Sequence, residues 1–156
     1  MIQKIIAVVV LSVGLMSCGG GNENNTGDTA KKSKPAESMI KKKVDPMQDK
    51  GVGPITNLTL DAEINTEMAE AGKAVYDKMC TACHKPAERF IGPAPKGILD
   101  RRTPEWVMNM ILNPDQMVKE NDQAKKLLME YNGSPMANQN LTEEEARQVL
   151  EYFRTL

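Results

Sequence analysis

The sequence Cys80-Thr81-Ala82-Cys83-His84 decides how the rest of this 156-residue chain is interpreted. Two cysteines three positions apart, followed directly by a histidine, form the C-x-x-C-H pattern of covalent haem attachment. In that chemistry both thiols bond carbons of one porphyrin, and the imidazole lies beneath the ring as the proximal ligand of the iron. The pattern is short, so its interpretation depends on what accompanies it.

Three other interpretations of the motif compete with haem attachment. A thioredoxin-like pair would stand beside a βαβ pattern, and the flanking segments show no buried parallel strands. A zinc site needs about four ligands, whereas Cys18 is the only further cysteine and His84 is the only histidine. A plain disulfide between Cys80 and Cys83 would leave the adjacent histidine unexplained. We therefore favour a haem site.

The composition fits one small domain built around such a group. Without its N-terminal third the chain keeps roughly 100 residues, which is enough for a single core. One Trp, three Tyr and two Phe are few for a core made of protein alone, and a buried porphyrin would add apolar bulk. The net charge of −1 gives no indication of nucleic-acid binding.

Residues 1–17 are predicted to be a signal peptide. A lysine precedes an apolar run, residues 5–15, which is shorter than the about 20 residues of a membrane span. The run ends in Leu15-Met16-Ser17-Cys18, which resembles the bacterial lipobox. That resemblance implies export and lipidation of Cys18, which would anchor the protein in a membrane. Gly19, in place of an aspartate, favours the outer over the inner membrane, and an ordinary cleaved signal is the alternative.

Residues 18–54 are expected to be the lipidated cysteine and a flexible tether. The segment is rich in Gly, Asn, Ser, Thr and Lys and has almost no apolar periodicity. Such a segment cannot bury enough surface to offset its loss of conformational entropy on ordering. About 30 residues of this kind would give a reach of tens of Å. The domain itself is expected to span residues 55–156, with residues 55–60 as an extended lead-in.

The patterns in residues 55–156 indicate an all-α domain. Each expected helix has a capping residue, a proline in its first turn or apolar residues at i, i+3, i+4 spacing. The expected helices run from Asn65 or Thr66 to the motif cysteines, over residues 103–113 and 122–131, and from Thr142, which forms a capping box with Glu145, to the C-terminal end. No confident strand is predicted.

The order of helix, C-x-x-C-H, helices, methionine-bearing loop and terminal helix over about residues 62–156 resembles the class I cytochromes c. It is most similar to the small monohaem, membrane-tethered lipoproteins of bacteria. Gly72 and Tyr76 precede the motif where that family has a glycine and an aromatic residue. The resemblance implies a class I cytochrome c-like fold around one covalent haem, attached through Cys80 and Cys83.

The resemblance also implies the ligands of the haem iron. His84 is the expected proximal ligand, and the carbonyl of Pro93 is expected to accept a hydrogen bond from it. No second histidine exists, so we expect a methionine on the other side, and Met136 lies in a non-helical stretch before the terminal helix. Proline precedes this methionine, whereas in the family it often follows. The alternatives are Met108, Met110, Met117 and Met129.

Two aromatic residues have two interpretations each. Trp106 either donates its indole N–H to a haem propionate, as a tryptophan does in relatives, or packs as the first-turn anchor of its helix. Tyr131 either reaches the haem pocket or belongs to the apolar stripe of its own helix.

These features predict an electron-transfer carrier rather than an enzyme. With His84 and Met136 on the iron no substrate reaches the metal, and no acid–base constellation accompanies the site. By resemblance, the expected partners are a quinol-oxidising complex, a terminal oxidase or a denitrification reductase such as nitrous oxide reductase, with the haem domain in the periplasm. A haem-based enzyme or gas-binding sensor, or a cytochrome subunit of a larger respiratory complex, is the alternative.

Overall fold

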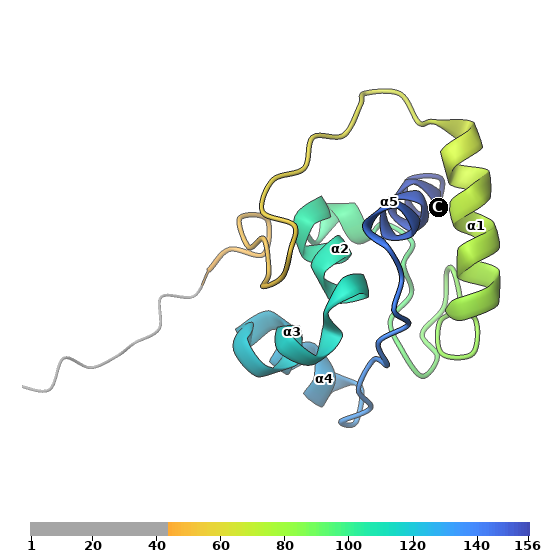
Figure 1. Cartoon of the computed structure of the whole chain (residues 1–156). Helices are drawn as coiled ribbons and strands as arrows, with labels where there is room; N and C mark the ends of the chain where they lie inside the picture. The colour runs from red at the N-terminus through yellow and green to blue at the C-terminus, as the bar shows by residue number, and fades with distance from the viewer. Residues whose placement is uncertain (1–43) are drawn as a thin grey trace, which may run out of the picture. The chain divides into compact units, whose positions relative to one another are not determined.

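The computed structural model describes residues 44–156, and this part of the chain contains five α-helices and one short 3₁₀ helix (Figure 1). In chain order they are α1 (Thr66–Met79), η1 (Ile98–Asp100), α2 (Pro104–Leu112), α3 (Pro114–Glu120), α4 (Asp122–Glu130) and α5 (Glu143–Phe153). No strand occurs among the described residues, which confirms the all-α prediction. The predicted signal peptide, Cys18 and most of the predicted tether lie outside the described residues.

The capping signals in the sequence form as expected. The side chain of Asn65, rather than Thr66, accepts a hydrogen bond from the N–H of Met68 at 2.9 Å and begins α1. Thr142 and Glu145 form both hydrogen bonds of a capping box at the start of α5. These bonds satisfy N–H groups that have no backbone acceptor within the helix.

Two helical elements were not predicted from the sequence. The Asn113-Pro114 pair ends α2, as expected, but the proline also occupies the first turn of α3, where its missing N–H costs nothing. Asn113 therefore closes one helix and opens the next. The 3₁₀ helix η1 is only three residues long and follows Gly97, whose φ of 63° lies in the left-handed region.

The closest packing between helices is that of α1 on α5, which lie side by side in Figure 1. Gly72 makes this approach possible, because a Cβ atom there would lie 1.9 Å from the backbone oxygen of Gln148 on α5. Beyond this contact the ring of Tyr76 packs against Tyr152, with their centroids 5.3 Å apart. α2 packs against α5 and α3, and α3 packs against α4.

Residues 49–60, here called the N-terminal strap, pack against α2 and α3. The amide of Asn109, which is 1% exposed, donates to the carbonyls of Lys50 and Ile55 at 2.9 and 2.8 Å and accepts from the N–H of Ile55 at 2.9 Å. The N–H of Val52 lies 3.0 Å from the sulfur of Met117. The predicted tether extended to Pro54, so it was too long at its C-terminal end: residues 49–54 belong to the folded domain.

A buried carboxylate joins the start of α1 to α5. Glu151 is completely buried, and one of its oxygens accepts from the N–H of Asn65 at 2.8 Å and from Arg154 at 2.7 Å. Its other oxygen accepts from Arg147 at 2.6 Å. Burial alone would raise the pKa of Glu151, but the hydrogen bonds from Asn65 and Arg147 outweigh it and hold the pKa below its ordinary value.

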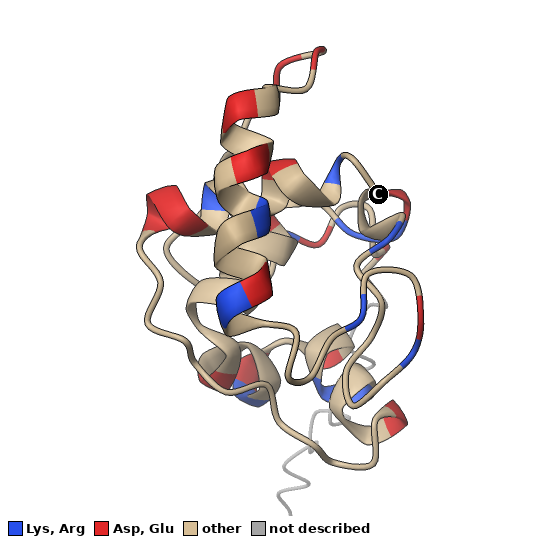
Figure 2. Ribbon diagram, turned by 90° about the vertical axis from the view of Figure 1, so that its right-hand side faces the viewer, with Lys and Arg blue, Asp and Glu red and all other residues tan. Residues whose placement is uncertain are grey.

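The surface of the described domain carries both signs of charge. Figure 2 shows acidic and basic residues interspersed along the helices. Among the described residues, no helix combines the length and apolar character that crossing a membrane requires.

Candidate functional site

A pocket lined mostly by apolar side chains lies between the C-terminal end of α1, the loop of residues 91–95, and helices α2 and α4. The C-x-x-C-H residues lie on one side of it, and the loop after α4 contributes residues 134–137. The pocket therefore brings together segments that are about 50 residues apart in the sequence.

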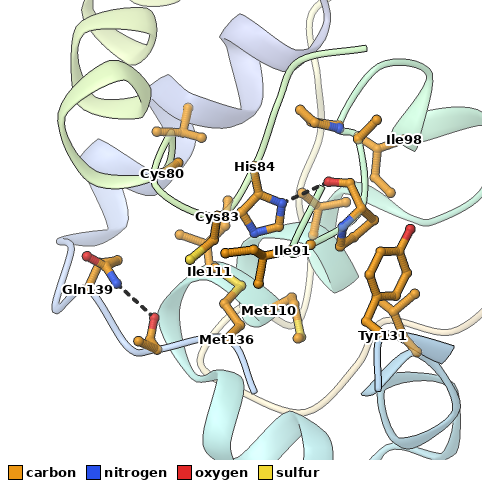
Figure 3. Close-up of a pocket in the computed structure, with 18 of the residues that line it drawn as sticks. Cys80, Cys83, His84, Ile91, Ile98, Met110, Ile111, Tyr131, Met136 and Gln139 are labelled. Atoms are coloured by element: carbon orange, nitrogen blue, oxygen red, sulfur yellow. Dashed lines mark hydrogen bonds between the residues drawn. The ribbon is translucent and has the colours of Figure 1, made fainter. Parts of the chain in front are cut away.

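A tight turn places the motif residues at the pocket. α1 ends at Met79, and the carbonyl of Cys80 then accepts hydrogen bonds from the N–H groups of Cys83 and His84 at 3.0 and 2.9 Å. Both thiols and the imidazole line the same pocket (Figure 3). The turn is thus short enough for all three groups to contact one bound molecule.

The state of the two cysteines argues against the competing interpretations of the motif. Both thiols are free, so they do not form a disulfide in this structure. Burial raises the pKa of Cys80 to about 11, whereas a thioredoxin-like cysteine has a lowered pKa. Within residues 44–156, no group of three or more His, Cys, Asp or Glu side chains is placed to hold a metal ion.

The imidazole of His84 is fixed by its surroundings. Its Nδ1 lies 2.8 Å from the carbonyl oxygen of Pro93, the contact implied for a proximal ligand. A carbonyl can only accept, so Nδ1 carries the proton and the lone pair is on Nε2, which points into the pocket (Figure 3). Gly92 is required beside the ring, because a Cβ atom there would lie 2.4 Å from its Cε1.

Among the candidate methionine ligands, only Met136 and Met110 line the pocket. Figure 3 shows both side chains reaching into it, Met136 from the loop after α4 and Met110 from α2. Met117 and Met108 are core residues, 0% and 2% exposed, and Met129 is 76% exposed. The structure therefore reduces the five candidates to two.

Trp106 lines the pocket with its ring, but its indole N–H has an acceptor within the protein. Nε1 donates to Oδ1 of Asn121 at 3.2 Å, and the side chain is 3% exposed. The amide of Asn121 in turn donates to the carboxylate of Asp49 in the strap at 2.8 and 2.9 Å. In this structure the indole N–H thus has an acceptor other than a haem propionate, and the bond to a propionate stays a prediction.

Tyr131 lines the pocket, as the first of its two interpretations expected. The guanidinium of Arg89 lies over its ring at 4.0 Å from the centroid and donates to the carbonyl of Glu130 at 2.7 Å. Arg89, which the sequence analysis did not single out, thereby connects the loop after the motif to the end of α4.

The residues of the pocket fit a covalently held haem. Two thiols and an imidazole with a free Nε2 lie at one side, thioethers reach in from other elements, and the remaining lining is largely apolar. This is the donor set that c-type haem uses: cysteines for attachment, histidine and methionine for the iron, and an apolar shell that excludes water.

Residues 69–156 match the family described as "Cytochrome c", and because this match covers more than half of the chain, the protein belongs to the cytochrome c family. Cytochrome c from Rhodothermus marinus is 41% identical, with a TM-score of 0.64 over 66% of this chain and 88% of that one. The engineered cytochrome c Rma TDE, from the same organism, is 40% identical, with a TM-score of 0.63 over 66% and 89%. Rma TDE bound to a carbene intermediate is also similar, at 41% identity and a TM-score of 0.61. No curated protein matches the chain.

Membership of this family settles the cofactor and the general activity. The protein binds a c-type haem covalently, with iron at its centre, and it acts in haem-based electron transfer.

Proposed function

We propose that the protein is a monohaem electron carrier in which Cys80 and Cys83 attach the haem and His84 and Met136 bind its iron. The observation that carries the proposal is the shared pocket, into which Nε2 of His84 and the Met136 side chain both point. The haem, when bound, supplies the one-electron chemistry. The protein supplies ligands, orientation and a dry environment.

Each group around the site has a separate task in this proposal. The Pro93 carbonyl fixes the tautomer of His84 and makes its imidazole a stronger donor to the iron. A thioether from Met136 is a soft ligand that raises the reduction potential. The apolar lining keeps water away from the iron. Because ferrous haem carries less charge than ferric haem, this dry environment also favours the reduced form.

The same ligand set supports a carrier rather than an enzyme. With two protein ligands on the iron, no position is left for a substrate. His84 is the only histidine in the chain, and its Nδ1 and Nε2 are both committed, so it is not available as a general base. An open sixth position would instead make the protein a haem enzyme or a gas sensor.

Replacement of Met136 by alanine tests the ligand assignment. We expect the reduction potential to fall and the ferrous protein to bind carbon monoxide rapidly, because the sixth position is vacated. Met129→Ala is the matched control, since that side chain is 76% exposed and outside the pocket. The same response in Met110→Ala, with none in Met136→Ala, would transfer the role to Met110. Rapid carbon monoxide binding by the unaltered protein would favour the open-site alternative.

We further propose that the domain is a periplasmic lipoprotein domain, tethered through lipid on Cys18 to the outer or inner membrane. The signal-like residues 1–17 and the lipobox support this. Its partners would be a quinol-oxidising complex as donor and a terminal oxidase or a denitrification reductase such as nitrous oxide reductase as acceptor. Cys18→Ala should release the haem protein from the membrane fraction. Persistent membrane association of that variant would refute the lipid anchor.

Co-purification separates a mobile carrier from a fixed subunit. The carrier proposal expects the protein, extracted in mild detergent, to elute apart from respiratory complexes. Stable elution with one oxidase or reductase would favour the subunit alternative.

A further inference from the structure

Tyr76 carries a hydroxyl that packing alone does not explain. The residue lies on α1, one turn before Cys80, and it is 1% exposed. Its ring packs against Tyr152 and Phe153 of α5, with centroid distances of 5.3 and 5.8 Å. A phenyl ring would make the same contacts. A buried hydroxyl, by contrast, loses its hydrogen bonds to water and destabilises the fold unless it finds a partner.

The partner of that hydroxyl is the backbone of the haem motif. Oη of Tyr76 donates to the carbonyl oxygen of His84 at 3.0 Å. No backbone N–H among the described residues bonds this carbonyl, because the chain leaves the turn here and enters the loop that leads to Pro93. The tyrosine therefore takes the place of a missing backbone donor.

Three hydrogen bonds together fix His84 and the peptide before it. Tyr76 holds the His84 carbonyl, Pro93 holds Nδ1 at 2.8 Å, and the N–H of Gly92 donates to the carbonyl of Cys83 at 2.8 Å. The bonds connect α1, the motif turn and the loop of residues 92–93. If the first is removed, the His84 carbonyl loses its hydrogen-bond partner, and we expect the Nδ1 bond to Pro93 to lengthen.

We propose that Tyr76 is a positioning residue for the axial ligand: its hydroxyl fixes the backbone of His84 and thereby the hydrogen bond from Nδ1 to Pro93. The inference rests on the proposed role of His84 as iron ligand. Under this proposal the hydroxyl of Tyr76 influences the reduction potential of the haem, which the packing of the ring alone would not do.

The test is Tyr76→Phe in the full haem-loaded protein, with Tyr152→Phe as the matched control. The control removes a hydroxyl from the same aromatic cluster without touching His84. Two properties are measured, namely the exchange rate of the His84 Nδ1 proton in the reduced protein by NMR, and the midpoint potential. We expect exchange to be at least tenfold faster and the potential to be higher in Tyr76→Phe, because a weaker bond to Pro93 makes the imidazole a poorer donor to ferric iron. Tyr152→Phe should match the unaltered protein.

Rescue keeps the result interpretable if Tyr76→Phe assembles poorly. A variant with 4-aminophenylalanine in place of Tyr76 retains an N–H donor at the same position, and it should restore haem content, exchange rate and potential. Unchanged exchange and potential in Tyr76→Phe, whatever happens to its thermal stability, would overturn the proposal, as would failure of the rescue. If the unaltered protein shows no haem-shifted His84 proton, the ligand assignment itself is wrong, which is a separate outcome.

Discussion

Replacing the buried Glu151 by glutamine should destabilise the domain more than any change of a surface charge. The substitution preserves the size of the side chain but turns one carboxylate oxygen into an NH₂ group. That oxygen accepts either from Arg147 or from both Arg154 and the N–H of Asn65. In one orientation the new NH₂ group faces the guanidinium of Arg147, and in the other it faces Arg154 and the N–H of Asn65. In both cases two donors face each other with no acceptor between them.

The contacts give the size of the effect. A hydrogen bond to a charged group contributes about 1.5–3 kcal/mol, and breaking one side of a buried ion pair costs about 3–5 kcal/mol. The Arg147 and Arg154 side chains are 19% and 12% exposed, so water replaces part of the loss. We therefore expect a loss of about 3 kcal/mol, which for a domain of this size lowers the melting temperature by about 12 °C or more.

Thermal unfolding followed by circular dichroism measures this loss, with Glu70→Gln on the exposed face of α1 as control. The pH dependence gives a second check. The pKa of Glu151 is lowered in the folded state, so its contribution is complete above the unfolded value of about 4.3 and disappears as the pH falls through the folded pKa. The gap between Glu151→Gln and the unaltered protein should therefore narrow in acid. A loss no larger than that of the control at neutral pH would refute the reasoning.

Three further substitutions test other parts of the structure. Asn109→Ala removes three hydrogen bonds to the strap and should cost about 2–3 kcal/mol, with the Ile55 amide exchanging much faster in hydrogen-exchange measurements. Gly72→Ala places a Cβ atom 1.9 Å from a backbone oxygen of α5 and should prevent recovery of stable haem-loaded protein, which absorbance of the purified fraction reports. Trp106→Phe removes the bond to Asn121 and should cost about 1 kcal/mol with an unchanged midpoint potential, whereas a shifted potential would revive the propionate interpretation.

Features governed by local sequence could be predicted. The cap at Asn65 and the capping box of Thr142 depend on residues three or four positions apart, so the sequence contains all the information they need. The turn over residues 80–84 likewise depends only on residues that are close together in the sequence. The helix α3 was missed because its signal, Pro114, serves equally as a helix stop and a helix start, and only the packing of α3 on α4 decides between them.

Features that depend on distant partners could not be predicted. Nothing around Lys50 or Ile55 shows that both will bond to Asn109, and the polar composition of the segment favours a tether. The role of Trp106 depends on Asn121, which lies in another helix–helix junction. Met136 was expected at the pocket from its place in the loop before the terminal helix, whereas the presence of Met110 in the same pocket depends on how α2 packs, which the sequence does not show.

The N-terminal strap also determines how the domain would bear a mechanical load. Tension along the N-terminal segment reaches the fold at Val44, whose carbonyl accepts from Gln123 at 3.4 Å. It then reaches Asp49, whose carboxylate bonds Asn121 and whose carbonyl accepts from Thr103 at 2.7 Å. The three bonds of Asn109 follow directly. A pull is therefore transferred to α2 and to the junction of α3 and α4. α1, with Cys80 and Cys83 following its far end, lies beyond these attachments and is shielded from the force.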